Sequence, residues 1–306
     1  MQKAPPTPKG FRDIEPELAK KRRDAIEKIV KVLESQEFGF EPIETPTIEF
    51  AETLEGKYGE EERLIYKFED RGGRKLALRY DLTVPLARFI ANHQELIARG
   101  PFRRYQIGQV FRGENPQHGR YREFTQLDFD SVGSTDLEED AKIIAAALKV
   151  ARATGLEKAT MAINHREIFK GHTVETIRAL DKYYKIGEDG VKKELVDKGV
   201  DKEKAERIIR EFTEAPRLED YKELKDILEQ THGLQLTRDF YFLRTLARGL
   251  DYYTGAIFEL KSNDDPGSLS IGAGGRYDNL IGTFAKRAIP AVGFSFGVDR
   301  LIETLP

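Results

Sequence analysis

Residues 102–131 read FRRYQIGQVFRGENPQHGRYREFTQLDFDS, and this stretch decides the fold. Polar and apolar residues alternate over 102–112 and again over 121–131, which predicts two strands. Residues 113–119 between them contain glycine and proline and are typical of a turn or loop. We therefore expect a β-hairpin here.

The second strand of this hairpin has an unusual polar side. A period of two places on one face Arg122, Phe124, Gln126, Asp128 and Asp130. A face turned into an ordinary core would be rich in valine and isoleucine. The polar side is therefore either a solvent-facing surface or a binding site, and the strand alone leaves both readings open. Leu127 and Phe129 lie on the opposite side, which is the expected core side.

The chain has 306 residues, enough for about two domains or for one large domain with an insertion. Residues 167–235 carry dense lysine and glutamate patterns of helical period, with no strand pattern between them. We interpret them as a small helical insertion that separates residues 1–166 from residues 236–306. A long helix is predicted near the start of the chain, over about residues 17–36.

Three local patterns predict how elements begin and end. Thr135 with Glu138 forms a capping box that starts a helix, and Gly155 closes it. Thr83 is a possible cap of another helix. The glycines in residues 272–275 predict a turn.

Composition excludes several kinds of chemistry. With 50 Lys+Arg and 53 Asp+Glu the formal net charge is −3, which argues against a dominant polyanion-binding surface but allows a local basic site. The absence of cysteine excludes disulfides and thiol nucleophiles, and the five histidines lack the close spacing of a zinc site. No apolar run is long enough for a membrane span, so we expect a cytoplasmic protein without a membrane partner.

Arginines gather around the predicted hairpin and recur later, at Arg112, Arg120, Arg122, Arg248 and Arg300. The guanidinium group suits phosphate oxygens, and a cation such as Arg300 in the first turn of a predicted helix opposes the helix dipole. We therefore expect an anionic partner there. Since the chain has no GxxxxGK[ST] loop and no GxGxxG between strand and helix, a nucleotide would be held by side chains on the sheet.

Taken together, several segments resemble the histidyl-tRNA synthetase family of class II aminoacyl-tRNA synthetases. Pro46 after the long helix, residues 111–126 and residues 293–300 resemble the three class II motifs. Residues 247–253 (ARGLDYY) and 274–278 (GGRYD) resemble the two histidine-specific signature blocks. The resemblance implies an α+β fold, with an antiparallel sheet flanked by helices and a small helical insertion, in a homodimer.

The resemblance also implies an enzyme that uses ATP to convert histidine to histidyl-adenylate and transfers histidine to the 3′ end of tRNA(His). It assigns Arg112 and Arg248 to catalysis at the α-phosphate, with magnesium carried by ATP, and it assigns no metal ligand from the protein. The implied ATP-binding residues are Arg112, Glu114, Arg120, Phe124 and Arg300. The implied histidine-binding residues are Asp81, Thr83 and Gln126 for the amino group, Asp130 and Tyr253 for the imidazole, and Tyr277, which closes the pocket.

Family members normally carry a C-terminal α/β domain that binds the anticodon stem, whereas this sequence stops six residues after Arg300. We therefore expect a catalytic domain that meets the acceptor end of tRNA(His). An alternative is the non-catalytic paralogue that regulates ATP phosphoribosyltransferase in histidine biosynthesis, which shares the fold and can lack that domain. A third possibility is a free-standing relative that makes an adenylate for another acceptor.

Overall fold

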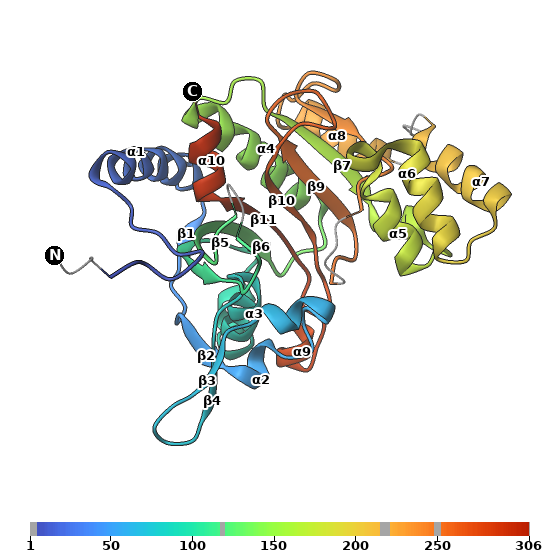
Figure 1. The fold of residues 1–306 in the computed structure, drawn as a ribbon. Coiled ribbons are helices and arrows are strands. Elements are labelled where there is room, and N and C mark those ends of the chain that lie inside the picture. The colour runs from blue at the N-terminus through green and yellow to red at the C-terminus, as the bar shows by residue number, and fades with distance from the viewer. Residues whose placement is uncertain (1–4, 117–119, 215–220, 248–251, 306) are drawn as a thin grey trace.

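A computed structural model describes residues 5–116, 120–214, 221–247 and 252–305. Within these ranges the predicted hairpin forms β5 (Phe102–Phe111) and β6 (Glu123–Val132), paired antiparallel from end to end. Both belong to a large central sheet with the strand order β1-β5-β6-β11-β10-β9-β7-β8 (Figure 1). Its other strands are β1 (Glu41–Pro42), β7 (Thr160–His165), β8 (Phe240–Phe242), β9 (Ala256–Lys261), β10 (Ser270–Arg276) and β11 (Ala291–Gly297). Neighbouring strands run antiparallel except for β1–β5 and β7–β8, at the two ends of the sheet.

Helices cover one face of the central sheet and form the main core with it. They are α1 (Pro16–Leu33), α4 (Leu137–Thr154) and α10 (Val298–Thr304) (Figure 1). Leu127 and Phe129 of β6 are fully buried in this core, as the period of two predicts. Burial of an apolar side chain of this size stabilises the fold by about 1.5–3 kcal/mol. The polar side of β6 is thereby directed to the other face of the sheet.

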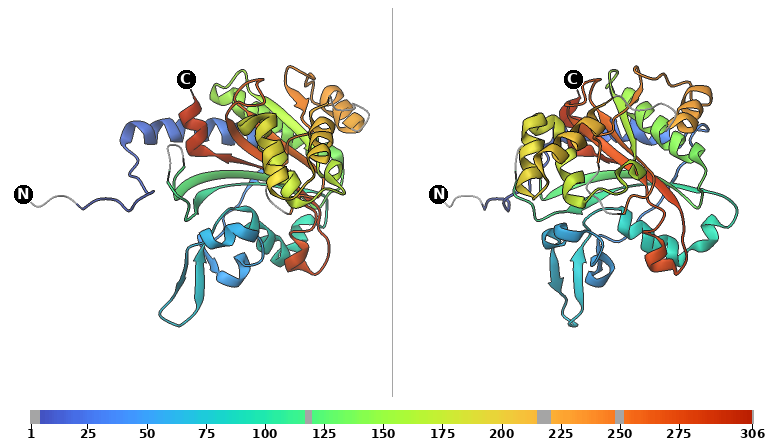
Figure 2. Two further views of the ribbon diagram at one scale, coloured as in Figure 1. Left: turned by 45° about the vertical axis from the view of Figure 1, so that its right-hand side comes forward. Right: turned by 90° about the vertical axis from the view of Figure 1, so that its right-hand side faces the viewer.

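A smaller layer lies beneath β5 and β6 (Figure 2). It contains a second sheet with the strand order β2-β4-β3, together with short helices. Its elements are β2 (Ile48–Phe50), β3 (Lys67–Glu69), β4 (Lys75–Leu78), α2 (Ala51–Leu54), α3 (Thr83–Asn92), α9 (Gly282–Ala285) and the 3₁₀ helices η1 (Gly59–Leu64) and η2 (Gln94–Ile97). Helix α3 begins close to the polar side of β6, which places its first residues at the cavity described below.

Further helices follow β7 at the side of the sheet (Figure 1). They are the 3₁₀ helix η3 (Arg166–Phe169), α5 (Val174–Leu180), α6 (Tyr183–Asp197), α7 (Lys202–Thr213) and α8 (Lys222–Gln230). Helix α6 packs against α5 and α7, whereas α8 packs against α4. No helix in the described ranges has the length and apolar character needed to cross a membrane.

The predicted turn at residues 272–275 is wrong, because these residues form the middle of β10. A Cβ atom on Gly274 would lie 2.1 Å from the carbonyl oxygen of Gly293 in β11. Here glycine permits a close approach of neighbouring strands, so this glycine-rich run reflects packing within a sheet.

The start of α4 also differs from the prediction. Asp136, and not Thr135, is the N-cap residue, and its carboxylate accepts a hydrogen bond of 3.0 Å from the backbone amide of Glu138. The other end of the helix is as predicted, since Gly155 adopts a left-handed conformation with φ of 112°.

Candidate functional site

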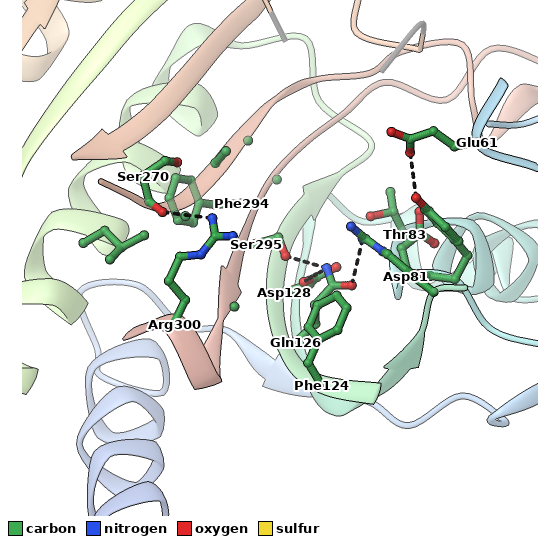
Figure 3. Close-up of a pocket in the computed structure, with 18 of the residues that line it drawn as sticks. Glu61, Asp81, Thr83, Phe124, Gln126, Asp128, Ser270, Phe294, Ser295 and Arg300 are labelled. Carbon is green, nitrogen blue, oxygen red and sulfur yellow. Dashed lines mark hydrogen bonds between the residues drawn. The ribbon is translucent and has the colours of Figure 1, made fainter. Parts of the chain in front are cut away.

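A cavity of about 470 Å³ opens on the polar side of β6 (Figure 3). Strands β6, β10 and β11 form one wall, and the segment that leads into α3 forms another. The cavity brings together the following residues that the sequence singled out: Asp81, Thr83, Arg112, Glu114, Arg120, Phe124, Gln126, Asp130, Tyr253, Tyr277 and Arg300. Arg248 lies outside the described residues.

Burial decides between the two readings of the polar strand face. Gln126, Asp128 and Asp130 are only 6%, 2% and 3% exposed, and all three line the cavity. This side of β6 is therefore not an ordinary solvent-facing surface. Burying a carboxylate is costly unless a hydrogen-bond donor or a cation compensates it. These side chains are therefore placed to contact such partners.

Asp130 is held from two sides. Its Oδ2 lies 2.6 Å from Nη2 of Arg104, although the two groups are not aligned as a hydrogen bond. The hydroxyl of Tyr277 donates to its Oδ1. Burial raises the pKa of Asp130, and both Arg104 and Tyr277 oppose that rise. A Cβ atom on Gly293 would lie 1.8 Å from the carboxylate, so glycine is required on the neighbouring strand.

The sequence reasoning missed Arg104, which is fully buried. The signal that could have revealed it is the pairing of the two hairpin strands. Residues 104 and 130 are direct partners in the register of β5 and β6, so their side chains share one face. A register derived from the hairpin loop would have placed Arg104 beside Asp130.

Asp81 lines the cavity and also hydrogen-bonds to the start of α3. Its Oδ1 accepts hydrogen bonds of 3.0 Å from the hydroxyl of Tyr58 and 3.0 Å from the backbone amide of Val84. Asp81 therefore satisfies the start of α3, and Thr83 is the first residue of that helix and not its cap. Burial raises the pKa of Asp81, while the Val84 amide and the charge of Arg112 lower it.

Arg112 is fixed between two aromatic rings. Its guanidinium carbon lies 4.4 Å from the ring centre of Tyr80 and 5.1 Å from that of Phe124. Its Nε donates a hydrogen bond of 3.1 Å to the Tyr80 carbonyl, and its Nη2 lies 3.4 Å from Oε1 of Gln126. These contacts hold a positive charge rigidly at the cavity wall.

Glu114 and Arg120 form an ion pair at the mouth of the cavity. The Arg120 side chain is 57% exposed, whereas that of Glu114 is largely buried. Arg122 has a different place, because its Nε donates a hydrogen bond of 2.9 Å to the backbone carbonyl of Glu114. It supports the loop after β5 and does not line the cavity.

Arg300 lies in the first turn of α10, as predicted, and reaches the far end of the cavity. Its Nη1 donates a hydrogen bond of 3.1 Å to the backbone carbonyl of Ser270 (Figure 3). The preceding residue, Asp299, pairs with Arg12 and Arg22 and accepts a hydrogen bond of 2.8 Å from the amide of Thr125. The start of α10 is thus tied to the N-terminal segment and to β6.

The sequence pattern places Asp128 on the polar face of β6 but assigns it no role, and it does not identify Ser295. Nε2 of Gln126 donates hydrogen bonds of 3.2 Å to Oδ1 of Asp128 and 2.6 Å to Oγ of Ser295 (Figure 3). Burial raises the pKa of Asp128 to about 7, with a further rise from the charge of Asp130 and an opposing effect of Arg104. The signal that would find Ser295 is the antiparallel register, which pairs residues 128 and 295.

The cavity therefore has two chemically different ends. Arg112, Arg120 and Arg300 suit phosphate or carboxylate oxygens. Asp81, Asp128 and Asp130 suit ammonium or ring N–H donors. Such a site fits a molecule that carries an amine, together with a polyphosphate.

Comparisons with known proteins agree with one another. The family profile described as "Histidyl-tRNA synthetase" matches residues 10–181 and 172–301. A curated histidine–tRNA ligase of Aeropyrum pernix is 43% identical, over 98% of this chain and 74% of its own length. The corresponding ligase of Wolinella succinogenes is 40% identical, over 98% of this chain and 75% of its own length.

Solved structures share the whole arrangement. A crystal structure of histidyl-tRNA synthetase from Nostoc sp. is 31% identical, with a TM-score of 0.79 over 97% of this chain and 74% of that one. A structure described as "ATP phosphoribosyltransferase regulatory subunit/histidyl-tRNA synthetase" from Bacillus halodurans is 25% identical, with a TM-score of 0.82 over 100% of this chain and 84% of that one. That description names both the regulatory subunit and the synthetase considered above.

Proposed function

The chain belongs to the histidyl-tRNA synthetase family, and from this premise we propose that the cavity on β6 is where histidine and ATP react. The protein is a histidine–tRNA ligase, which activates histidine with ATP to histidyl-adenylate and transfers histidine to the 3′ end of tRNA(His). The fold is that of a class II catalytic domain. The regulatory alternative has no better support, because the relatives at about 40% identity are described as ligases.

The single observation that carries the site assignment is the two-ended cavity. We assign histidine to the acidic end, where Asp81, Thr83 and Gln126 receive its ammonium group. Asp130 and Tyr253 read its imidazole, and Tyr277 closes this end through its bond to Asp130. A site built to satisfy these donors rejects an amino acid that lacks them, because buried acceptors would be left unpaired.

ATP occupies the cationic end in this proposal. Glu114 and Phe124 receive the adenine, which requires the ion pair between Glu114 and Arg120 to open. Arg120 and Arg300 then bind the β- and γ-phosphates, and magnesium arrives with ATP as part of the substrate. Arg112 is the cationic residue next to the acidic end, with its Nη2 3.4 Å from Oε1 of Gln126, and it contacts the α-phosphate.

The proposed reaction joins the two ends. A carboxylate oxygen of histidine attacks the α-phosphorus, the new oxygen–phosphorus bond forms, and the bond to the leaving pyrophosphate breaks. Negative charge increases on the α-phosphate oxygens, and Arg112, already fixed by Tyr80 and Phe124, stabilises it without reorganising. Arg248 is assigned to the same step on the resemblance of residues 247–253 alone.

The larger organisation is also part of this proposal. Residues 1–166 and 236–306 form the catalytic domain, and residues 167–235 form an inserted helical segment. We propose a homodimer that uses the outer face of the small sheet, where Ile48, Phe50 and Phe68 are exposed. We assign the enzyme to the cytoplasm, and the absence of cysteine, which fits a reducing compartment, supports this assignment.

Histidine-dependent exchange of pyrophosphate into ATP tests the proposed function. The wild-type protein should catalyse exchange with histidine and not with other amino acids. Arg112→Ala should lower the exchange rate at least about 100-fold, the loss typical of removing one group that stabilises transition-state charge. Arg99→Ala is the control, because Arg99 is exposed and does not line the cavity. Histidine binding without any exchange by the wild-type protein would instead support the regulatory paralogue.

A further inference from the structure

Asp128 has an oxygen that nothing in the described part of the chain satisfies. The residue is 2% exposed and lines the cavity, and its Oδ2 has no hydrogen-bond partner there. Its Oδ1 accepts from the amide of Gln126, and the hydroxyl of Ser295 hydrogen-bonds to the same carboxylate. A buried carboxylate oxygen without a donor is costly, so Asp128 is prepared for a donor that the cavity's occupant supplies.

The charges around Asp128 also indicate that its partner is a ligand in the cavity. Asp130 has a direct cationic partner in Arg104, and Asp81 accepts two hydrogen bonds on one oxygen. Asp128 has no ion pair within 4.0 Å among the described residues. The charges of Arg104 and Arg79 attract its carboxylate only from a greater distance. Of the three aspartates at this end of the cavity, Asp128 therefore gains most from a cationic ligand.

Resting on the proposed function, we propose that Asp128 is a further histidine-binding residue. Its Oδ2 accepts an N–H of the substrate ammonium group, and its Oδ1 keeps the Gln126 amide turned so that Oε1 faces the cavity. The Gln126 amide donates to Asp128 and Ser295, which leaves its carbonyl oxygen toward Arg112 (Figure 3). One carboxylate thus contacts the substrate directly and also orients its neighbour.

A pH dependence follows from this contact. The groups that face Asp128 are Asp130 and Gln126 on β6, Arg104 on β5, Ser295 on β11, and Asp81 and Arg79 beside α3. With its pKa raised to about 7 by burial, Asp128 is mostly protonated at pH 6 and ionised at pH 8. Binding of an ammonium group requires the ionised form, so histidine binding by the wild-type protein loses a contribution as the pH falls.

Asp128→Asn tests the proposal through the KM values of the exchange reaction. The KM for histidine should rise at pH 8 while the KM for ATP changes little. The ratio of the variant's histidine KM to that of the wild type should be about tenfold larger at pH 8 than at pH 6, because a group with a pKa near 7 must be ionised at pH 6 before it can bind a cation. The ionisation of free histidine cancels in this ratio.

Ser295→Ala is the matched control, because it removes a partner of the Gln126 amide and keeps the Asp128 carboxyl group, although loss of the Ser295 hydroxyl raises the pKa of Asp128 further. If Asp128 only orients Gln126, both variants raise the histidine KM equally and without pH dependence, and the direct contact is disproved. An unchanged histidine KM in Asp128→Asn overturns the proposal entirely. Should the Asn variant not fold, Asp128→Ser retains a hydroxyl for Gln126 and carries the same expectations. If the wild-type protein shows no histidine-dependent exchange, the proposed function itself is contradicted. That outcome differs from a failure of the Asp128 proposal, in which the wild-type protein is active.

Discussion

Arg104 and Asp130 place opposite charges almost entirely inside the protein. The Arg104 side chain is completely buried, and its closest charged contact is the Asp130 carboxylate at 2.6 Å. Such a pair adds little net stability compared with two well-packed apolar residues, because both charges lose their hydration. Its value here is positional, since Arg104 fixes an acidic group at the end of the cavity.

Removal of Arg104 alone should therefore be severe. Arg104→Met leaves the Asp130 carboxylate buried without its partner and should lower the free energy of unfolding by about 3–5 kcal/mol at pH 8. Without the arginine, the pKa of Asp130 rises further above its unfolded value, so the loss should shrink as the pH falls and Asp130 becomes protonated. Urea unfolding at pH 8 and pH 5 measures both effects.

A double variant completes this test. Arg104→Met combined with Asp130→Asn removes both charges, and it should be more stable at pH 8 than Arg104→Met alone. A double variant that simply added the two single losses would contradict a direct interaction. An equal loss at both pH values would show that Asp130 is not the group left uncompensated.

At the scale of elements, the ends of helices are where the sequence pattern was least reliable. The hairpin, the buried side of β6 and the end of α4 at Gly155 follow directly from periodicity and from glycine's tolerance of positive φ. The start of α4 does not, because Thr135 and Asp136 are both good caps and only the backbone path selects one. At Thr83 the capping bond came from Asp81, a residue assigned solely to substrate binding.

The choice of cap at α4 can be measured. Asp136→Ala removes the bond to the Glu138 amide and should lower the free energy of unfolding by about 1 kcal/mol. Thr135→Ala is the matched control, since Thr135 is exposed and precedes the cap, and it should change stability by less than about 0.5 kcal/mol. Thermal or urea unfolding of the two variants compares them, and a larger loss in Thr135→Ala would restore the predicted capping box.

At the scale of the whole molecule, the sequence predicted which residues lie near one another more reliably than it predicted their side-chain contacts. The motif resemblance assigned residues of distant segments, such as Asp81, Gln126 and Tyr277, to one binding site, and these residues line one cavity in the structure. It could not supply Arg104 or Ser295, because their places depend on which strands are neighbours and in what register. The central sheet joins strands far apart in the chain, and periodicity within one strand says nothing of its neighbour.

The small sheet carries the surface that we propose above as the interface between two copies of the chain. Its inner face packs toward α3 through Ala77 and the pair of Glu49 with Arg88. Its outer face carries a continuous set of apolar side chains that share one side through strand pairing, namely Ile48, Phe50, Phe68, Leu76 and Leu78. Contiguous apolar patches of this kind on a protein surface commonly mark contacts with another protein.

Phe50→Glu tests whether this face joins two copies. Phe50 is 52% exposed in the single chain, so a charge there is tolerated in an isolated subunit but would be desolvated between two subunits. The variant should therefore dissociate to monomers at concentrations at which the wild type is a dimer, as measured by sedimentation velocity. Val196→Glu, at a similarly exposed apolar residue on α6, is the control and should leave the dimer intact. A Phe50→Glu protein that sediments as the wild type does would assign the interface to another surface.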